Sequence, residues 1–330
     1  MRALLKKIGV DWFIMAIACC ILAAYICPEI GMERDPISFG DIATFGVSMI
    51  FFFYGLKLNA QKLKVGLKNT RLHCTIHIMT FLAFPLLVLG AMQFADFSPD
   101  SPHYYQWLGV FFLATLPSTV SSSVVMVSIA GGNIPAAIFN ASISSLIGVF
   151  LTPIWMGIFV DAESGGYPIG EIVFKLILQV LLPLALGLLL NRKFGVFAEK
   201  HKAGLRLFDQ ITILMIIYAS FCQSFADKMF EGYSLLNLAA LSAGVIAMFF
   251  VLYGFIYLVA KILKFSREDK ITALFCGSKK SLVHGSVMSH VIFSSGAVAG
   301  VVLLPTMIYH AAQLVIVSAI ARGFSAKKAE

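Results

Sequence analysis

Charged residues are scarce in this chain. Of its 330 residues only 13% are Asp, Glu, Lys or Arg, whereas 59% are hydrophobic, and the mean hydropathy is +0.89. An ordinary soluble domain has about 25% charged residues and could not bury this much apolar surface. The composition therefore predicts an all-α polytopic membrane protein, because helices satisfy their own backbone in lipid.

The sequence also lacks the motifs of several function classes. It has no HExxH, no GxSxG and no nucleotide-binding loop, so we expect neither an enzyme nor ATP-driven transport by this chain alone. Its six cysteines form no CxxC pair, so we expect no metal and no other cofactor. The basic loops have no interleaved aromatic residues, which argues against nucleic acid as a partner. As a membrane protein, the chain is expected to contact membrane lipid.

Ten apolar segments are long enough to cross a bilayer, since each crossing needs about 20 residues. Only short polar connections separate them, the longest near residues 191–209, so we expect one transmembrane domain over residues 1–330. Its halves, about 1–164 and 165–330, hold five spans each, which permits an inverted repeat. The predicted spans are 10–27, 39–58, 72–94, 105–130, 134–160, 172–190, 210–225, 236–263, 271–293 and 298–320.

Basic residues gather at the termini and in the connections after the second, sixth and eighth spans. Cytoplasmic loops retain Lys and Arg, so we expect a multi-pass inner-membrane protein with both termini in the cytoplasm. The opposite side is mainly acidic and has only Arg34 and Lys228. The basic residues of the cytoplasmic side are Arg2, Lys6, Lys7, Lys57, Lys62, Lys64, Lys68, Arg71, Arg192, Lys193, Lys200, Lys202, Arg206, Lys261, Lys264, Arg267, Lys270, Arg322, Lys327 and Lys328.

Two spans are interrupted near their middle. The fourth contains Pro117, followed by the hydroxyls of Ser118, Thr119 and Ser121–Ser123. A proline frees backbone groups that are tolerated at this depth only against protein or water, so the break predicts a binding cavity. A simple proline kink, closed by Ser and Thr side chains, is the alternative.

The ninth span contains Lys279 and Lys280 about 13 Å beyond Lys270, too deep for a lysine to reach the interface. Each costs about 2.5–3.5 kcal/mol at this depth, and no span holds an Asp or Glu at comparable depth to offset it. An anionic substrate would complete the charge balance. Ser281, His284 and, on the fifth span, Asn140 and Ser142 extend the same predicted site, although small polar residues also mediate helix packing.

Five segments together resemble the bile acid:sodium symporter family. The resemblance is strongest to the branch with member seven of solute carrier family ten and the YfeH-type bacterial symporters, and it covers essentially the whole chain. The segments are 51–58 (FFFYGLKL), 116–126 (LPSTVSSSVVM), 131–148 (GGNIPAAIFNASISSLIG), 275–282 (FCGSKKSL) and 305–314 (PTMIYHAAQL).

The resemblance implies ten helices in two inverted five-helix repeats, with two discontinuous helices crossing at the ion site. It matches Ser123 to a serine of the sodium-coupled members, whereas further hydroxyl positions fall at Ala137 and Ala141. The acidic sodium ligand falls at about Phe275 or Cys276, and a glutamine falls at about Lys279. This departure argues against sodium coupling.

These features favour a secondary active transporter that moves a small organic anion by alternating access, with sodium or a proton as the coupling ion. The resemblance suggests an anion of bile-acid or steroid type. A regulatory or scaffold membrane protein without transport is the alternative.

A reporter fused after Glu330 tests the orientation. Because the basic residues gather on one side of the membrane, a reporter that is active only in the cytoplasm is expected to work at this position. Activity of a periplasm-specific reporter there would invert the topology.

Overall fold

The computed structural model describes residues 12–32, 39–58, 68–98, 100–101, 103–164, 169–231, 234–293 and 295–329, with the side chains at 39–41, 43–44, 121, 160–164 and 326–329 left out. Within these ranges the chain is helical and contains no strand, which confirms the all-α prediction. The basic residues Arg2, Lys6, Lys7, Arg34, Lys62 and Lys64, used above for orientation, lie outside the described residues.

The helices follow one another with short connections. The order is α2 (Trp12–Ile26), η1 (Pro28–Ile30), α3 (Phe39–Lys57), α5 (Thr70–Ile78), η2 (Met79–Ala83), α6 (Phe84–Met92), α7 (Tyr104–Thr115), α8 (Ser121–Ala130), α9 (Ile134–Ser164), α10 (Ile169–Leu176), η3 (Ile177–Leu181), α11 (Leu182–Lys200), α12 (Lys202–Ala226), α13 (Leu235–Ile262), α14 (Arg267–Gly277), α15 (Leu282–Ile292) and α16 (Gly296–Ala329).

Six helical stretches are long and apolar enough to cross a membrane. They are Thr70–Met92, Ile134–Phe159, Ile169–Lys200, Lys202–Ala226, Leu235–Ile262 and Gly296–Ser325, and Trp12–Ile26 and Phe45–Lys57 are shorter apolar helices. Two of the long stretches contain one π-helical turn each, η2 and η3. The predicted fourth and ninth spans are instead pairs of short helices, α7 with α8 and α14 with α15.

One polar connection differs from its prediction. Residues 191–209 were expected to form a loop, but α11 continues to Lys200 and α12 begins at Lys202, so only His201 interrupts the helices. The residues here include Ala, Leu, Lys, Arg and Glu, which have high helix propensity in water. Asn191 also donates to the Leu56 carbonyl at 2.6 Å, which holds this end of α11 against α3.

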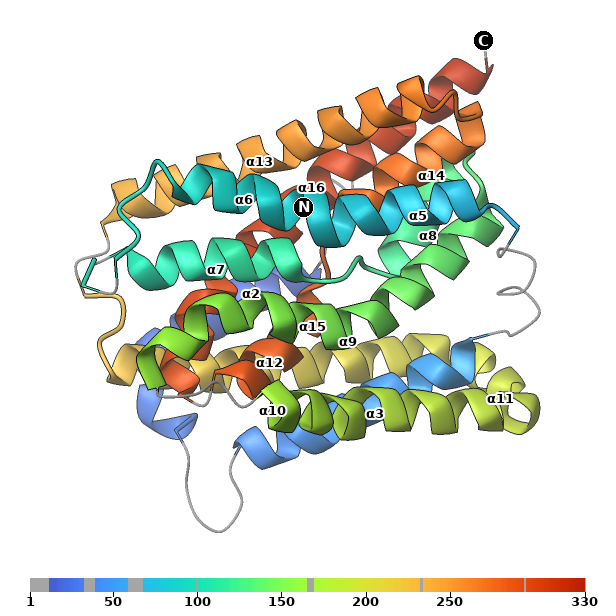
Figure 1. The fold of residues 1–330 in the computed structure, drawn as a ribbon. Helices are drawn as coiled ribbons and strands as arrows, with labels where there is room; N and C mark the ends of the chain where they lie inside the picture. The colour runs from blue at the N-terminus through green and yellow to red at the C-terminus, as the bar shows by residue number, and fades with distance from the viewer. Residues whose placement is uncertain are drawn as a thin grey trace.

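The helices form two groups that run side by side. Helices α2, α3, α11 and α12 pack on one another, and Figure 1 shows α3, α11 and α12 together along one face of the molecule. The other group holds both broken helices together with α5, α6, α9, α13 and α16. Helix α16 joins the two groups through its contact with α12, where Ser224 donates to the Ala297 carbonyl at 2.7 Å.

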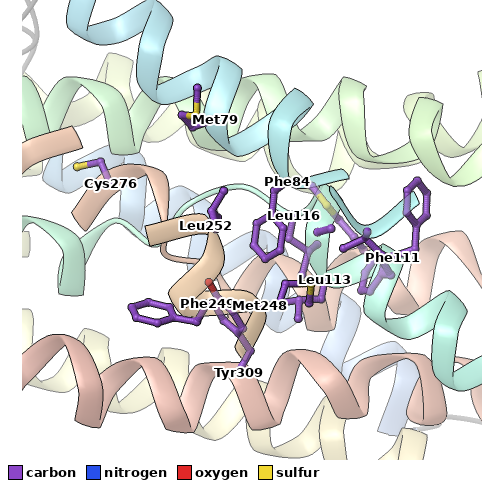
Figure 2. Close-up of a cluster of buried hydrophobic side chains, with 14 of the residues drawn as sticks. Met79, Phe84, Phe111, Leu113, Leu116, Met248, Phe249, Leu252, Cys276 and Tyr309 are labelled. Carbon is purple, nitrogen blue, oxygen red and sulfur yellow. The ribbon is translucent and has the colours of Figure 1, made fainter. Parts of the chain in front are cut away.

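Aromatic side chains fill the space between the broken helices and their neighbours. Figure 2 shows Phe84 beside Leu116, and Phe249 of α13 beside Tyr309 of α16. The Tyr309 ring lies 6.0 Å from the Phe84 ring and 5.9 Å from the Phe249 ring, measured between centroids. This cluster buries one side of the two helix breaks.

Two glycines let α3 and α11 approach to backbone contact. A Cβ on Gly55 would overlap with the Leu184 carbonyl oxygen, and a Cβ on Gly187 would overlap with the Phe52 carbonyl oxygen. Because these neighbours are backbone atoms, no side-chain rotation relieves the overlap. The α3–α11 pair therefore depends on glycine at both positions, as in other helix pairs of membrane proteins.

Replacing Gly187 by Ala should destabilise the protein by about 1–3 kcal/mol, the usual cost of overpacking. The measurement is the thermal unfolding midpoint of the purified protein in detergent. Gly244→Ala is the matched control, because nothing lies within 4 Å of the added Cβ and alanine favours helix. Equal midpoints for the two variants would contradict the close contact.

Candidate functional site

The two helix breaks meet each other. Residues 116–120 separate α7 from α8, and residues 278–281 separate α14 from α15. The Ser281 amide donates to the Pro117 carbonyl at 2.9 Å, so the two extended segments touch directly. Four helix ends therefore point toward one small volume, and their unpaired backbone groups need partners there.

Side chains of another helix pair the free backbone groups at the first break. Proline at position 117 has no amide to continue the helix. The Thr115 carbonyl accepts from the Thr152 hydroxyl at 2.9 Å, and the Ser118 amide donates to the Ser144 hydroxyl at 2.9 Å. Both partners lie on α9, so polar residues of the fifth predicted span hold the first break in place.

Lys280 occupies the centre of the crossing and is fully buried. Its ammonium donates to the carbonyls of Ala114 at 2.6 Å, Leu116 at 2.8 Å and Thr80 at 2.8 Å. The positive charge also lies at the C-terminus of α7, where the helix dipole is negative. Neither Lys280 nor Lys279 forms an ion pair with any carboxylate whose position the structure describes.

The Thr80 carbonyl has no partner within its own helix because of Pro85, a residue that the sequence pattern did not connect with the site. In the π-helical turn η2 the Phe84 amide bonds to the Met79 carbonyl, and the next residue, Pro85, has no amide to donate. Two carbonyls thus lack helix partners: that of Thr80 accepts from Lys280, and that of Phe81 accepts from the Trp155 indole at 2.8 Å. Pro85 is the sequence signal for this third element of the site.

Lys279 is equally buried but has different surroundings. Its ammonium donates to the Ser122 hydroxyl at 2.6 Å. That hydroxyl lies 2.9 Å from the Thr119 hydroxyl, which lies 2.9 Å from the Ser123 hydroxyl. Ser123 in turn donates to the Phe275 carbonyl at 3.4 Å, so a chain of hydroxyls runs from Lys279 back to α14.

Helix α16 pairs the free backbone of the second break. The Gln313 amide group accepts from the Lys280 backbone amide at 3.0 Å and donates to the Lys280 carbonyl at 2.8 Å. The Tyr309 hydroxyl donates to the Ser278 carbonyl. Both residues lie in the segment 305–314, where the sequence pattern alone predicts no role for them.

A cavity of about 410 Å³ lies beside the crossing, a volume typical of small-molecule sites. Its wall at the crossing is formed by Thr119, Ser122, Ser281 and His284. The ring of His284 is fixed by Ser281, whose hydroxyl lies 2.9 Å from Nδ1, while Nε2 has no partner among the described residues. The remaining lining is mainly apolar, with a charged end formed by Lys57, Arg206 and Asp209.

Comparison with known proteins gives the family. The model of the SBF-like CPA transporter family matches residues 11–326, almost the whole chain. The chain belongs to this transporter family. The finding confirms the resemblance that the five sequence segments indicated, and together with the apolar helices it identifies a multi-pass membrane protein.

Three relatives illustrate the similarity. "Uncharacterized protein PA2026" of Pseudomonas aeruginosa is 35% identical and aligns over 96% of this chain and 94% of its own length. "Putative symporter YfeH" of Escherichia coli is 33% identical, with 95% and 92% covered. "Sodium/bile acid cotransporter 7-B" of Xenopus laevis is 30% identical, with 95% and 91% covered.

The predicted site residues of this SBF-like chain fall into three sets. Thr119, Ser122, Ser281 and His284 line the cavity, whereas Ser123, Lys279 and Lys280 are buried in the crossing behind it. Asn140 and Ser142 bond to the carbonyls of their own helix at Ala136 and Ile138. Only Ser142 of this pair approaches the cavity, through the Tyr54 hydroxyl at 3.4 Å. The Ser121 side chain lies outside the described residues.

Single cysteines in a cysteine-free background test the cavity wall. Ser122→Cys and Val125→Cys are expected to react with a small aqueous thiol reagent, because both positions line the cavity. Ser123→Cys, one residue away and fully buried, is the matched control and is expected to stay protected in the same conformation. Inertness at both lining positions would favour a closed proline kink over a cavity.

Proposed function

We propose that this chain is a secondary active transporter that moves a small organic anion across the inner membrane by alternating access, and that it does so without sodium. The supporting observation is the cavity beside the crossing of two broken helices, with the buried ammonium groups of Lys279 and Lys280 behind its wall. Broken helices at a midplane cavity are the usual construction of a secondary transporter site.

The charges around the cavity favour an anion. Lys57 and Arg206 line its charged end, where Asp209 lies 3.8 Å from the Lys57 ammonium. Among the side chains that the structure describes, no Asp or Glu is buried, whereas Lys279 and Lys280 are. A substrate with a negative group near Ser122 and an apolar body would match both the cationic and the apolar parts of the wall.

The proposed membrane topology has ten crossings. The six long helices, the shorter helices α2 and α3, and the two broken pairs supply this number, five in each half. With the basic loops in the cytoplasm, the charged end of the cavity faces the cytoplasm. At the other end of α12, Ser224 bonds to Ala297 of α16, which fits a conformation that is open inward and closed outward.

The proposed independence from sodium follows from the position of the lysines. A sodium ion at a helix crossing supplies one positive charge to hydroxyls and carbonyls, and the two lysines supply charge to such groups here. The resemblance places a glutamine of the sodium-coupled members at about Lys279. Lys280 has the larger number of carbonyl partners, so both residues belong to the proposed site.

Uptake of labelled organic anions by proteoliposomes tests the proposal. We expect saturable uptake that is equal with and without a sodium gradient, and we expect Lys279→Gln to abolish it or make it depend on sodium. Ser128→Ala, an exposed position on α8, is a control that should keep the wild-type rate. Wild-type uptake that rises steeply with sodium would contradict the role of the lysines. Absence of uptake over a broad panel of anions would favour a regulatory or scaffold protein.

A further inference from the structure

The three oxygens around the Lys280 ammonium form a site made of backbone alone. They come from Thr80 in η2, Ala114 in α7 and Leu116 in the following break, so the site exists only when two predicted spans pack together. The N–O distances of 2.6–2.8 Å are those of short charge-assisted hydrogen bonds. No carboxylate takes part, so the oxygens attract a cation through their dipoles.

The hydrogen-bond inventory selects a primary ammonium ion. Such an ion has three donors and no acceptor, and the Lys280 ammonium has three carbonyl acceptors. Carbonyl oxygens cannot donate hydrogen bonds. A neutral primary amine has only two N–H donors, so one of the three oxygens would lack a hydrogen bond and would face the nitrogen lone pair. The site therefore suits a singly charged cation that presents three hydrogens.

An aromatic face adds to the preference for a cation. The Lys280 Nζ atom lies 4.7 Å from the centroid of the Phe84 ring and 6.0 Å from that of the Phe81 ring. A cation within about 6 Å of an aromatic face is attracted by the ring quadrupole, more strongly when water is absent. Phe84 is fully buried, so this attraction acts in a dry environment.

We propose that the carbonyls of Thr80, Ala114 and Leu116 are a monovalent-cation site whose permanent occupant is the chain's own Lys280. With the side chain removed, the site binds an external primary ammonium ion. The inference goes beyond the transport function proposed above and holds for a transporter and for a scaffold protein alike. A covalently attached cation stays at the site at any salt concentration, so the crossing remains assembled without a dissolved ion.

Lys279 provides a matched control within the same break. It is the neighbouring residue and just as buried, but among the described side chains its ammonium donates to a single hydroxyl, that of Ser122. Removing either side chain leaves a slot of similar size. Only the slot left by Lys280 contains three carbonyl acceptors.

Chemical rescue tests the site. Lys280→Ala removes three methylene groups and the ammonium, and n-propylammonium replaces these same groups. The purified full chain in detergent should have a lower thermal unfolding midpoint as Lys280→Ala than as wild type. Saturating n-propylammonium should raise the midpoint of the variant by about 5 °C or more, because it binds only the folded state. The uncharged 1-propanol should have no such effect.

The controls make each outcome decisive. For Lys279→Ala, the n-propylammonium concentration that gives half of the maximal rise in midpoint should be roughly tenfold higher than for Lys280→Ala. The reason is that the slot left by Lys279 offers one hydroxyl acceptor, whereas the slot left by Lys280 offers three carbonyls. Equal responses of the two variants, or equal effects of n-propylammonium and 1-propanol on Lys280→Ala, would overturn the proposal. If Lys280→Ala does not fold even with n-propylammonium, Lys280→Met is the variant to test, because methionine fills most of the slot and removes only the charge. Ammonium chloride should raise the midpoint of this variant more than choline chloride does, and equal effects would refute the cation site.

Discussion

The pairing of free backbone groups at the crossing is the constraint on which the rest of the structure depends. Four helix ends meet inside the protein, and each carbonyl or amide that is buried there without a partner would cost several kcal/mol. The partners come from η2, α9, α16 and the facing break itself. These helices are therefore held around the crossing as one unit, and the hydroxyls, Gln313 and the lysines act as parts of its framework.

Burying two ammonium groups is tolerable because their partners are already arranged. The carbonyls at the end of α7 have no partners within the broken helix. Lys280 supplies them with donors, and they supply its ammonium with acceptors. The favourable interaction with the helix dipole and the Phe84 ring adds to this pairing. A fixed cation also keeps the wall beside the cavity positive, which is the feature that an anionic substrate would use.

The helices form two groups, and the crossing belongs to only one of them. Close glycine contact holds α3 against α11. The cavity lies between α3 and α12 on one side and the crossing on the other, except where the Phe51 ring of α3 packs on the His284 ring, 5.1 Å away between centroids. The groups touch directly where α12 meets α16. If the chain works by alternating access as proposed, one group would rock against the other about such a contact.

The sequence by itself determined the class of the molecule, the existence of both helix breaks and the family. Hydrophobic length, Pro117 and the pair Lys279 and Lys280 are local features, and local features can be read along a chain. It did not determine which groups surround each lysine. Thr80, Ala114 and Leu116 offer only backbone oxygens, which every residue has, and they became a site because Pro85 and Pro117 left them unpaired where two helices pack together. The different surroundings of the two adjacent lysines were therefore decided by tertiary packing, which alone brings distant carbonyls to one point.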